Sequence, residues 1–207
     1  AWLTWNHPNM PWDGTELWVA PVQNDGTLGR AVKVAGGEEE AIFCPQWSPD
    51  GVLHFVSDRT GWWNLYRWRG TRVEALAPMP AEFGVPQWVF GMSTYTFTAA
   101  GQLICAYTSQ GLWHLAKLTE GRLQPLELPY TEFSALRAAG QRIVCRAGSP
   151  AEPTSLLLLN PATGQFEVLK RSIAAEIDRR CLSAPQPIEF PTENGLTAYA
   201  LYYPPRN

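Results

Sequence analysis

The sequence has no long hydrophobic run and no recognisable leader segment. No apolar stretch approaches the roughly 18 residues that cross a bilayer. Residues 1–10 show neither the basic start nor the apolar core of a signal peptide. We therefore expect no membrane partner, and the cytoplasm as the compartment.

Charge is sparse and nearly balanced. Charged residues make up 17% of the 207 residues, and 16 basic against 19 acidic side chains give a formal net charge of −3. A chain of this kind has no basic field to hold a phosphate backbone. We expect no nucleic-acid partner.

The four cysteines, Cys44, Cys105, Cys145 and Cys181, lie far apart in the sequence. None has the close neighbour that zinc sites and redox motifs require, so no metal and no cofactor is expected. Cys44, Cys105 and Cys145 each lie in an apolar, strand-like run. This placement predicts buried, reduced thiols.

What the chain does have is aromatic bulk and frequent turns. Hydrophobic residues reach 45%, with 10 Trp, while 18 Pro and 17 Gly punctuate the sequence. The length predicts one domain or one domain with a small addition. Many short elements around an apolar core are expected.

A repeat runs along the chain, marked by turns that end in Gly51, Gly101 and Gly140. Each turn joins two apolar runs, and each unit of about 40 to 50 residues contains four short strands, which is typical of a β-propeller. Amphipathic stretches of helical period are nearly absent. We predict an all-β fold, a partial β-propeller of about four four-stranded antiparallel blades.

The predicted propeller spans residues 1–184, and its first blade begins at its second strand. The predicted blades are residues 1–36, 41–77, 85–129 and 130–171. Residues 185–207 then break the repeat, with a linker and a hairpin over 188–191 and 197–203 that we expect to open a second, truncated domain. The absence of an initiator Met also indicates a fragment. An open arc exposes two apolar blade faces, which predicts self-association or blades missing from the ring.

The order of strands in a meander separates two faces. Tight turns join strands one to two and three to four on one face, and the remaining connections lie on the other. That second face receives the longer, aromatic and charged loops at 7–14, 38–40, 58–63 and 78–84. Binding residues concentrate on such loops, so we expect function there.

Four stretches in order carry a family resemblance. They are residues 7–18, the run 36–40, the turn Trp47-Ser48-Pro49-Asp50-Gly51 with Gln46 before it, and residues 57–66, which begin Ser57-Asp58-Arg59. Together they resemble the prolyl oligopeptidase family, and within it the dipeptidyl aminopeptidase and acylaminoacyl peptidase branch. Residues 187–196 resemble the junction into that family's catalytic domain.

The resemblance implies a propeller, typically seven-bladed, joined to an α/β-hydrolase domain that holds a Ser, Asp and His triad. No Gly-x-Ser-x-Gly nucleophile elbow occurs in the sequence, since Gly91-Met92-Ser93 lacks the closing Gly. The three histidines, His7, His54 and His114, have no partner pattern for a general base; we expect His54 and His114 at the surface or in the core. We assign no catalytic residue, and expect the hydrolase domain, the remaining blades and short peptides as partners.

Seven residues are candidates for substrate binding or domain docking: Glu38, Glu39, Asp58, Arg59, Trp12, Trp62 and Trp63. Glu38 and Glu39, with Glu40, suit the α-amino group of a peptide, as glutamates do by resemblance in dipeptidyl peptidases; the alternative is a solvated strand edge. Asp58 and Arg59 would pair with each other or with the hydrolase domain, or clamp a loop. The three tryptophans would stack on substrate, dock the second domain or pack between blades. The other seven tryptophans are predicted in strands: Trp2, Trp5, Trp18, Trp47, Trp68, Trp88 and Trp113.

Two functions follow from this reading. The first is a non-catalytic propeller fragment of a serine peptidase, which gates access of short peptides to the hydrolase domain and docks that domain. The alternative is a stand-alone TolB-like module that binds protein partners through the same loops. The hairpin favours the first.

Overall fold

The computed structural model of the chain describes residues 1–174 and 178–206, and it confirms the all-β class. The first sheet has three strands, β1 (Trp2–Thr4), β2 (Glu16–Val19) and β3 (Val32–Gly36). The second has four, β4 (Ile42–Trp47), β5 (Leu53–Ser57), β6 (Asn64–Arg69) and β7 (Arg72–Ala75).

The next two sheets also have four strands each. The third contains β8 (Tyr95–Phe97), β9 (Leu103–Ser109), β10 (Leu112–Thr119) and β11 (Arg122–Pro125). The fourth contains β12 (Glu132–Ala139), β13 (Arg142–Ser149), β14 (Glu152–Leu159) and β15 (Phe166–Arg171). Strands are antiparallel and in sequence order within every sheet, as in propeller blades.

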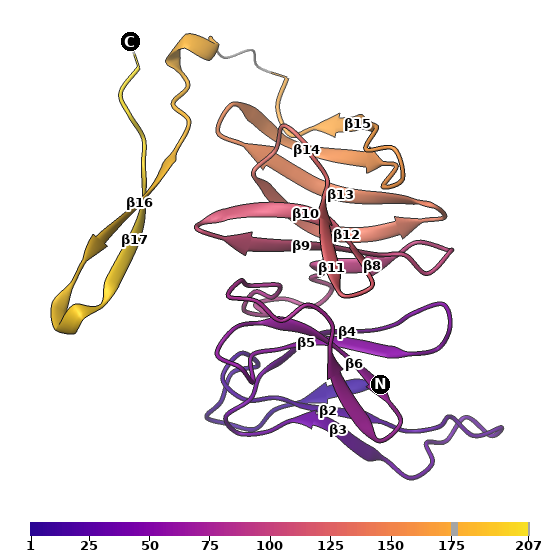
Figure 1. Ribbon diagram of the computed structural model, residues 1–207. Coiled ribbons are helices and arrows are strands. Elements are labelled where there is room, and N and C mark those ends of the chain that lie inside the picture. The colour runs from indigo at the N-terminus through magenta and orange to yellow at the C-terminus, as the bar shows by residue number, and fades with distance from the viewer. Residues whose placement is uncertain (175–177, 207) are drawn as a thin grey trace.

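The four sheets stack in chain order, and three buried apolar clusters lie between them (Figure 1). In β9, Leu103, Cys105 and Tyr107 belong to the cluster shared with the second sheet, whereas Ile104 and Ala106 belong to the cluster shared with the fourth. Successive side chains of a strand point to opposite faces, so this strand is buried on both sides. Cys44, Cys105 and Cys145 are buried and free, as predicted.

The repeated turns have a common backbone conformation. Gly51, Gly101 and Gly140 have φ of 78°, 82° and 65°, a left-handed conformation that glycine adopts without strain. Each glycine lies in the turn between the first and second strands of its sheet.

Two first strands bulge at corresponding places. The register of β4 shifts between Phe43 and Gln46, and that of β12 shifts between Ser134 and Arg137. Cys44 and Ala135, inside these bulges, have φ of 53° and 54°. The Tyr95 hydroxyl donates to the Cys44 carbonyl oxygen at 2.7 Å, so the first bulge is tied to the next sheet.

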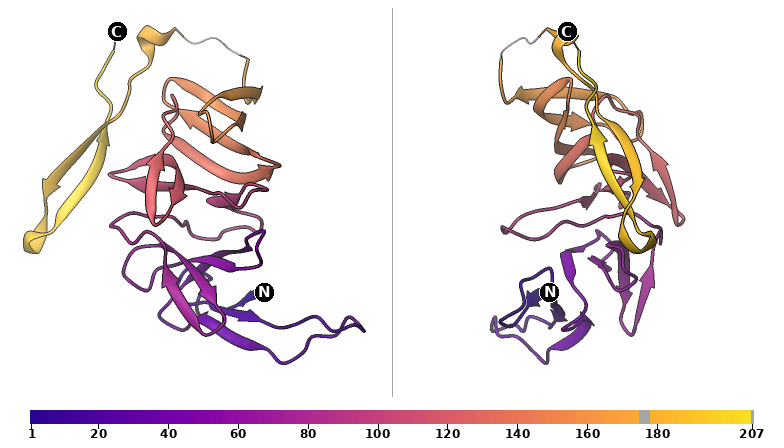
Figure 2. Two further views of the ribbon diagram at one scale, coloured as in Figure 1. Left: turned by 45° about the vertical axis from the view of Figure 1, so that its right-hand side comes forward. Right: turned by 90° about the vertical axis from the view of Figure 1, so that its left-hand side faces the viewer.

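A separate hairpin, β16 (Gln186–Pro191) and β17 (Thr197–Tyr202), stands beside the stack (Figure 2). A cleft of about 540 Å³ lies between it and the β9–β10 turn, lined by Gln110 and Gly111 on one side and by Ile188, Tyr199 and Leu201 among others on the hairpin. The hairpin therefore lies on the side of the stack that carries the connections from second to third strands.

Truncating a side chain between the third and fourth sheets should destabilise the fold strongly. Leu157 is completely buried, so we expect Leu157→Ala to lower the free energy of unfolding by about 2–5 kcal/mol through lost burial and a residual cavity. Its neighbour Leu156 is 41% exposed and supplies the matched control, Leu156→Ala. Urea unfolding followed by circular dichroism measures both; equal losses would contradict the two-sided packing.

Candidate functional site

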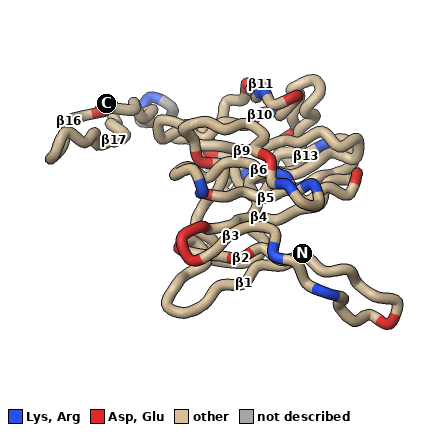
Figure 3. The backbone as a smooth tube through the Cα atoms, turned by 60° about the horizontal axis from the view of Figure 1, so that its bottom comes forward, with Lys and Arg blue, Asp and Glu red and all other residues tan. Residues whose placement is uncertain are grey.

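The face that carries the hairpin also carries the long connections. We call it the connection face and define it by residues 5–15, 37–41, 58–63 and 76–94. The acidic run 38–40 follows β3 directly, and Figure 3 shows an acidic segment of the chain beside that strand. This is the face to which the meander argument assigns function.

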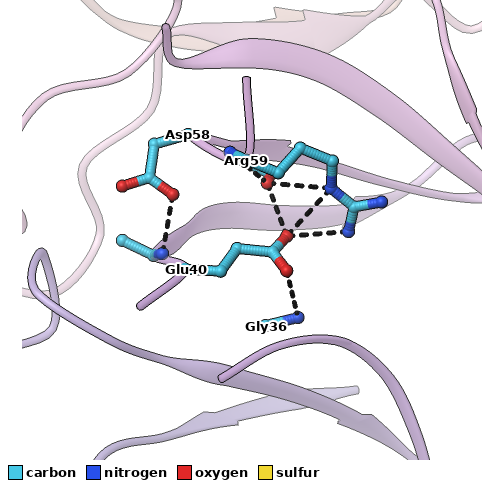
Figure 4. Close-up of polar contacts among 6 residues, drawn as sticks. Gly36, Glu40, Asp58 and Arg59 are labelled. Carbon is cyan, nitrogen blue, oxygen red and sulfur yellow. Dashed lines mark hydrogen bonds and ion pairs between the residues drawn. The ribbon is translucent and has the colours of Figure 1, made fainter. Parts of the chain in front are cut away.

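Glu40 is held at the centre of a polar clasp (Figure 4). Its Oε1 accepts hydrogen bonds from Ser57 Oγ at 2.6 Å and from Arg59 Nη2 at 2.7 Å. Its Oε2 accepts from the Gly36 backbone N–H at 3.2 Å. Because Gly36 ends β3 and Ser57 ends β5, this single carboxylate ties the first sheet to the second.

Asp58 supports the same junction through the backbone. Its Oδ1 accepts from the Ala41 N–H at 2.8 Å. Burial raises the pKa of the Asp58 carboxyl, while the Ala41 N–H opposes that rise. Arg59 lies with its Cζ 4.9 Å from the Tyr66 ring centroid. Within the described residues, Arg59 pairs with Glu40 and not with Asp58.

Glu38 and Glu39 differ from Glu40 in being exposed. The Glu38 carbonyl oxygen accepts from Asn9 Nδ2 at 3.2 Å, but across residues 1–174 and 178–206 neither carboxylate has a hydrogen-bond or ion-pair partner. These two carboxylates are open to a cation from solvent. Their role in binding stays a prediction.

The three candidate tryptophans have different surroundings. Trp63 packs against the cluster between the second and third sheets, with its ring edge-on to Phe43 at 6.0 Å, and its backbone N–H donates to Glu82 Oε2 at 2.8 Å. Trp12 is tilted against Trp88, with ring centroids 4.3 Å apart. Trp62 is 43% exposed. Only Trp63 is thus placed in packing between sheets.

The connection from β7 to β8 contains a run of three exposed apolar residues that the sequence analysis did not predict. Trp88, Val89 and Phe90 are 72%, 64% and 85% exposed. The prediction that Trp88 lies in a strand is wrong, and Trp5 also falls outside β1. Pro78, Pro80 and Pro86 explain the long irregular segment, because proline cannot donate to a strand ladder.

The histidines form no catalytic constellation. His54 is buried, with Nδ1 at 3.0 Å from the Val52 carbonyl oxygen and its ring 4.8 Å from Phe97. Burial lowers the pKa of His54. His114 stacks on Tyr107 at 5.2 Å, and His7 is exposed. His54 lies in β5, His114 in β10 and His7 in the connection from β1 to β2.

In the described part of the chain, no three His, Cys, Asp or Glu side chains gather as metal ligands would. No helix there has the length and apolar character needed to span a membrane.

Comparison with solved structures supplies the family. A puromycin-hydrolysing peptidase of Mycobacterium tuberculosis matches 100% of this chain with 33% identity and a TM-score of 0.91. A puromycin hydrolase in complex with PGG matches 99% with 34% identity and a TM-score of 0.87. The chain matches the propeller region of prolyl oligopeptidase-family peptidases.

This propeller region spans about a third of the solved chains, 32% in both of those matches. Prolyl oligopeptidase B from Galerina marginata is more distant, with 10% identity and a TM-score of 0.69 over 92% of this chain, and shares the fold. No family model matches the sequence, and a search of curated proteins finds no match.

The clasp around Glu40 should contribute measurably to stability. Glu40→Gln removes the charge that Arg59 and Ser57 bind, and since the group is only partly buried we expect a loss of about 1 kcal/mol in the free energy of unfolding. Glu39→Gln removes the same charge from an exposed neighbour and should change it by less than about 0.5 kcal/mol. Thermal unfolding distinguishes the two; an equal effect would mean that the clasp does not hold the sheets.

His54 should make stability depend on pH. Its folded-state pKa is lowered, so the unfolded chain binds the proton more tightly, and stability is lost as pH falls below the ordinary histidine value of about 6.5. We expect the urea midpoint to fall between pH 8 and pH 5, and His54→Gln to reduce that fall. His114→Gln is the control, and a wild-type midpoint that is flat over this range would contradict the assignment.

Proposed function

We propose that this chain is a non-catalytic propeller part of a serine peptidase of the prolyl oligopeptidase family, which gates access of short peptides to a hydrolase domain and docks that domain. The hairpin β16–β17 carries the proposal. It lies beside the β9–β10 turn at Gly111, on the side of the stack that also carries the connection face, and the puromycin hydrolase matches extend over essentially the whole chain, the hairpin included.

The hairpin has a surface suited to docking. Phe190, Tyr199, Leu201 and Tyr202 are exposed by 46%, 68%, 38% and 47% on its two strands. Aromatic and aliphatic side chains at such a density favour burial against a partner. A hydrolase domain that continues from this hairpin covers them and is thereby held over the connection face.

The residues that the connection face presents support the proposed gating role. Glu38 and Glu39 offer two unneutralised carboxylates, and Trp62, Trp88 and Phe90 offer exposed aromatic area. A peptide arriving at this face meets charge suited to its α-amino group and apolar surface suited to its side chains. We assign the parent to the dipeptidyl aminopeptidase and acylaminoacyl peptidase branch, with short peptides as substrates in the cytoplasm.

The outer side of the fourth sheet also exposes apolar side chains that a partner could cover. Leu156 and Leu169 are exposed by 41% and 43%. Further blades of the ring, or a second copy of the chain, would bury them.

The proposal predicts the size and reactivity of the native protein. An antibody raised against this chain should detect, in its source cells, a band far above 23.1 kDa that a fluorophosphonate serine probe labels. The isolated chain should neither hydrolyse a peptide p-nitroanilide nor take up the probe. A native band at 23.1 kDa that stays unlabelled would overturn the proposal and favour a stand-alone TolB-like binding module.

A further inference from the structure

A hollow of about 460 Å³ lies among β1, β4, β12 and the connection that leads to β8. All four sheets or their connections line it: Leu3 and Trp5 from the first, Cys44 and Gln46 from the second, Phe90 from the connection to the third, and Arg137 from the fourth. Its volume is that of an ordinary small-ligand site, which begins near 300 Å³. The seven candidate residues of the sequence reading do not line it.

Arg137 is fixed in this hollow by uncharged oxygens. Its Nη1 donates to Ser93 Oγ and, at 2.8 Å, to the Leu136 carbonyl oxygen, while Nη2 donates to the Gly91 carbonyl oxygen. Among the residues that the structure describes, no carboxylate lies within 4.0 Å of the guanidinium. The positive charge is therefore oriented but not neutralised.

An un-neutralised guanidinium suits an anionic ligand group, and the other lining residues indicate which further groups the ligand would carry. Leu3, Trp5 and Phe90 supply apolar and aromatic surface beside the guanidinium. Gln46 uses Nε2 as a donor to the Tyr95 carbonyl oxygen at 2.8 Å, which fixes its side chain and leaves Oε1 as an acceptor. The Arg137 cation would pair with a ligand carboxylate and the Gln46 amide oxygen with a ligand N–H. The apolar wall would contact a ligand side chain.

We infer that Arg137 binds the C-terminal carboxylate of a short peptide in this hollow, with the terminal side chain against Trp5 and Phe90. The inference rests on the proposed function and specifies which end of the peptide the propeller recognises. A planar guanidinium is the side chain best suited to a carboxylate. Arg137 is the sole basic side chain among the hollow's described lining residues, which suits a singly charged group better than a phosphate.

The test compares two peptides that differ only at the C-terminus, Ala-Ala-Phe with a free carboxylate and Ala-Ala-Phe amide. Calorimetric titration of the 207-residue chain with each should show binding of the acid at least tenfold tighter than that of the amide, with the difference reduced by added salt. Arg137→Gln should remove the preference. Arg137→Lys, which keeps the charge but loses the planar fork, should retain part of it.

Arg142→Gln is the matched control, because Arg142 is an exposed arginine of β13 outside the hollow. It should leave the preference unchanged. Thermal unfolding of each variant separates a binding defect from loss of the fold, and the comparison of acid with amide uses the unaltered chain.

Equal affinity for acid and amide would overturn the inference, as would absence of binding or a loss with Arg142→Gln equal to that with Arg137→Gln. None of these results bears on the size of the native protein or its labelling by fluorophosphonate. Failure of the Arg137 site is thereby distinguishable from failure of the proposed function.

Discussion

Burial on both faces of the middle sheets is the constraint on which the rest of this structure depends. Leu53 and Phe55 of β5 pack toward the first sheet while Val56 packs toward the third, and β9 repeats the arrangement one sheet further on. A sheet of this kind is not stable alone, because each of its apolar faces must be buried against a neighbouring sheet. The stack is therefore the unit of stability, and the loops at its ends are positioned by it.

Two sets of polar contacts link neighbouring sheets of this stack. The Glu40 carboxylate joins Gly36 of the first sheet to Ser57 and Arg59 of the second. The bulge at Cys44 is fixed by the Tyr95 hydroxyl of the third sheet. Each of them joins a polar group of one sheet to a side chain of the next, which adds directional contacts to the apolar packing between the sheets.

Much of the fold was accessible from the sequence, because strand alternation and turn glycines are local signals. Gly51, Gly101 and Gly140 marked the repeat, and their common left-handed conformation is the physical reason. The site was less accessible. Arg59 has its partner 19 residues away in Glu40, and Arg137 reaches Gly91 across 46 residues. Such pairings depend on how sheets meet, which no local pattern records.

The burial of individual tryptophans was also not predictable from local sequence. Trp63 and Trp88 look alike in sequence, each in an apolar stretch near proline or glycine. Trp63 is partly buried, and its ring occupies space that a Cβ at Gly84 would fill, whereas Trp88 lies in a connection interrupted by proline and remains 72% exposed. Hydrophobicity alone does not separate these two outcomes; the backbone around each residue does.

The hollow beside Arg137 is walled by residues of the first, second and fourth sheets and of the connection that leads to the third. A molecule bound there would contact several sheets at once, so separating the first sheet from the fourth would also remove its binding site. Occupancy then adds to the resistance of the whole stack to unfolding, in proportion to the logarithm of ligand concentration over its dissociation constant. The stack would in this way be held most firmly when the hollow is occupied.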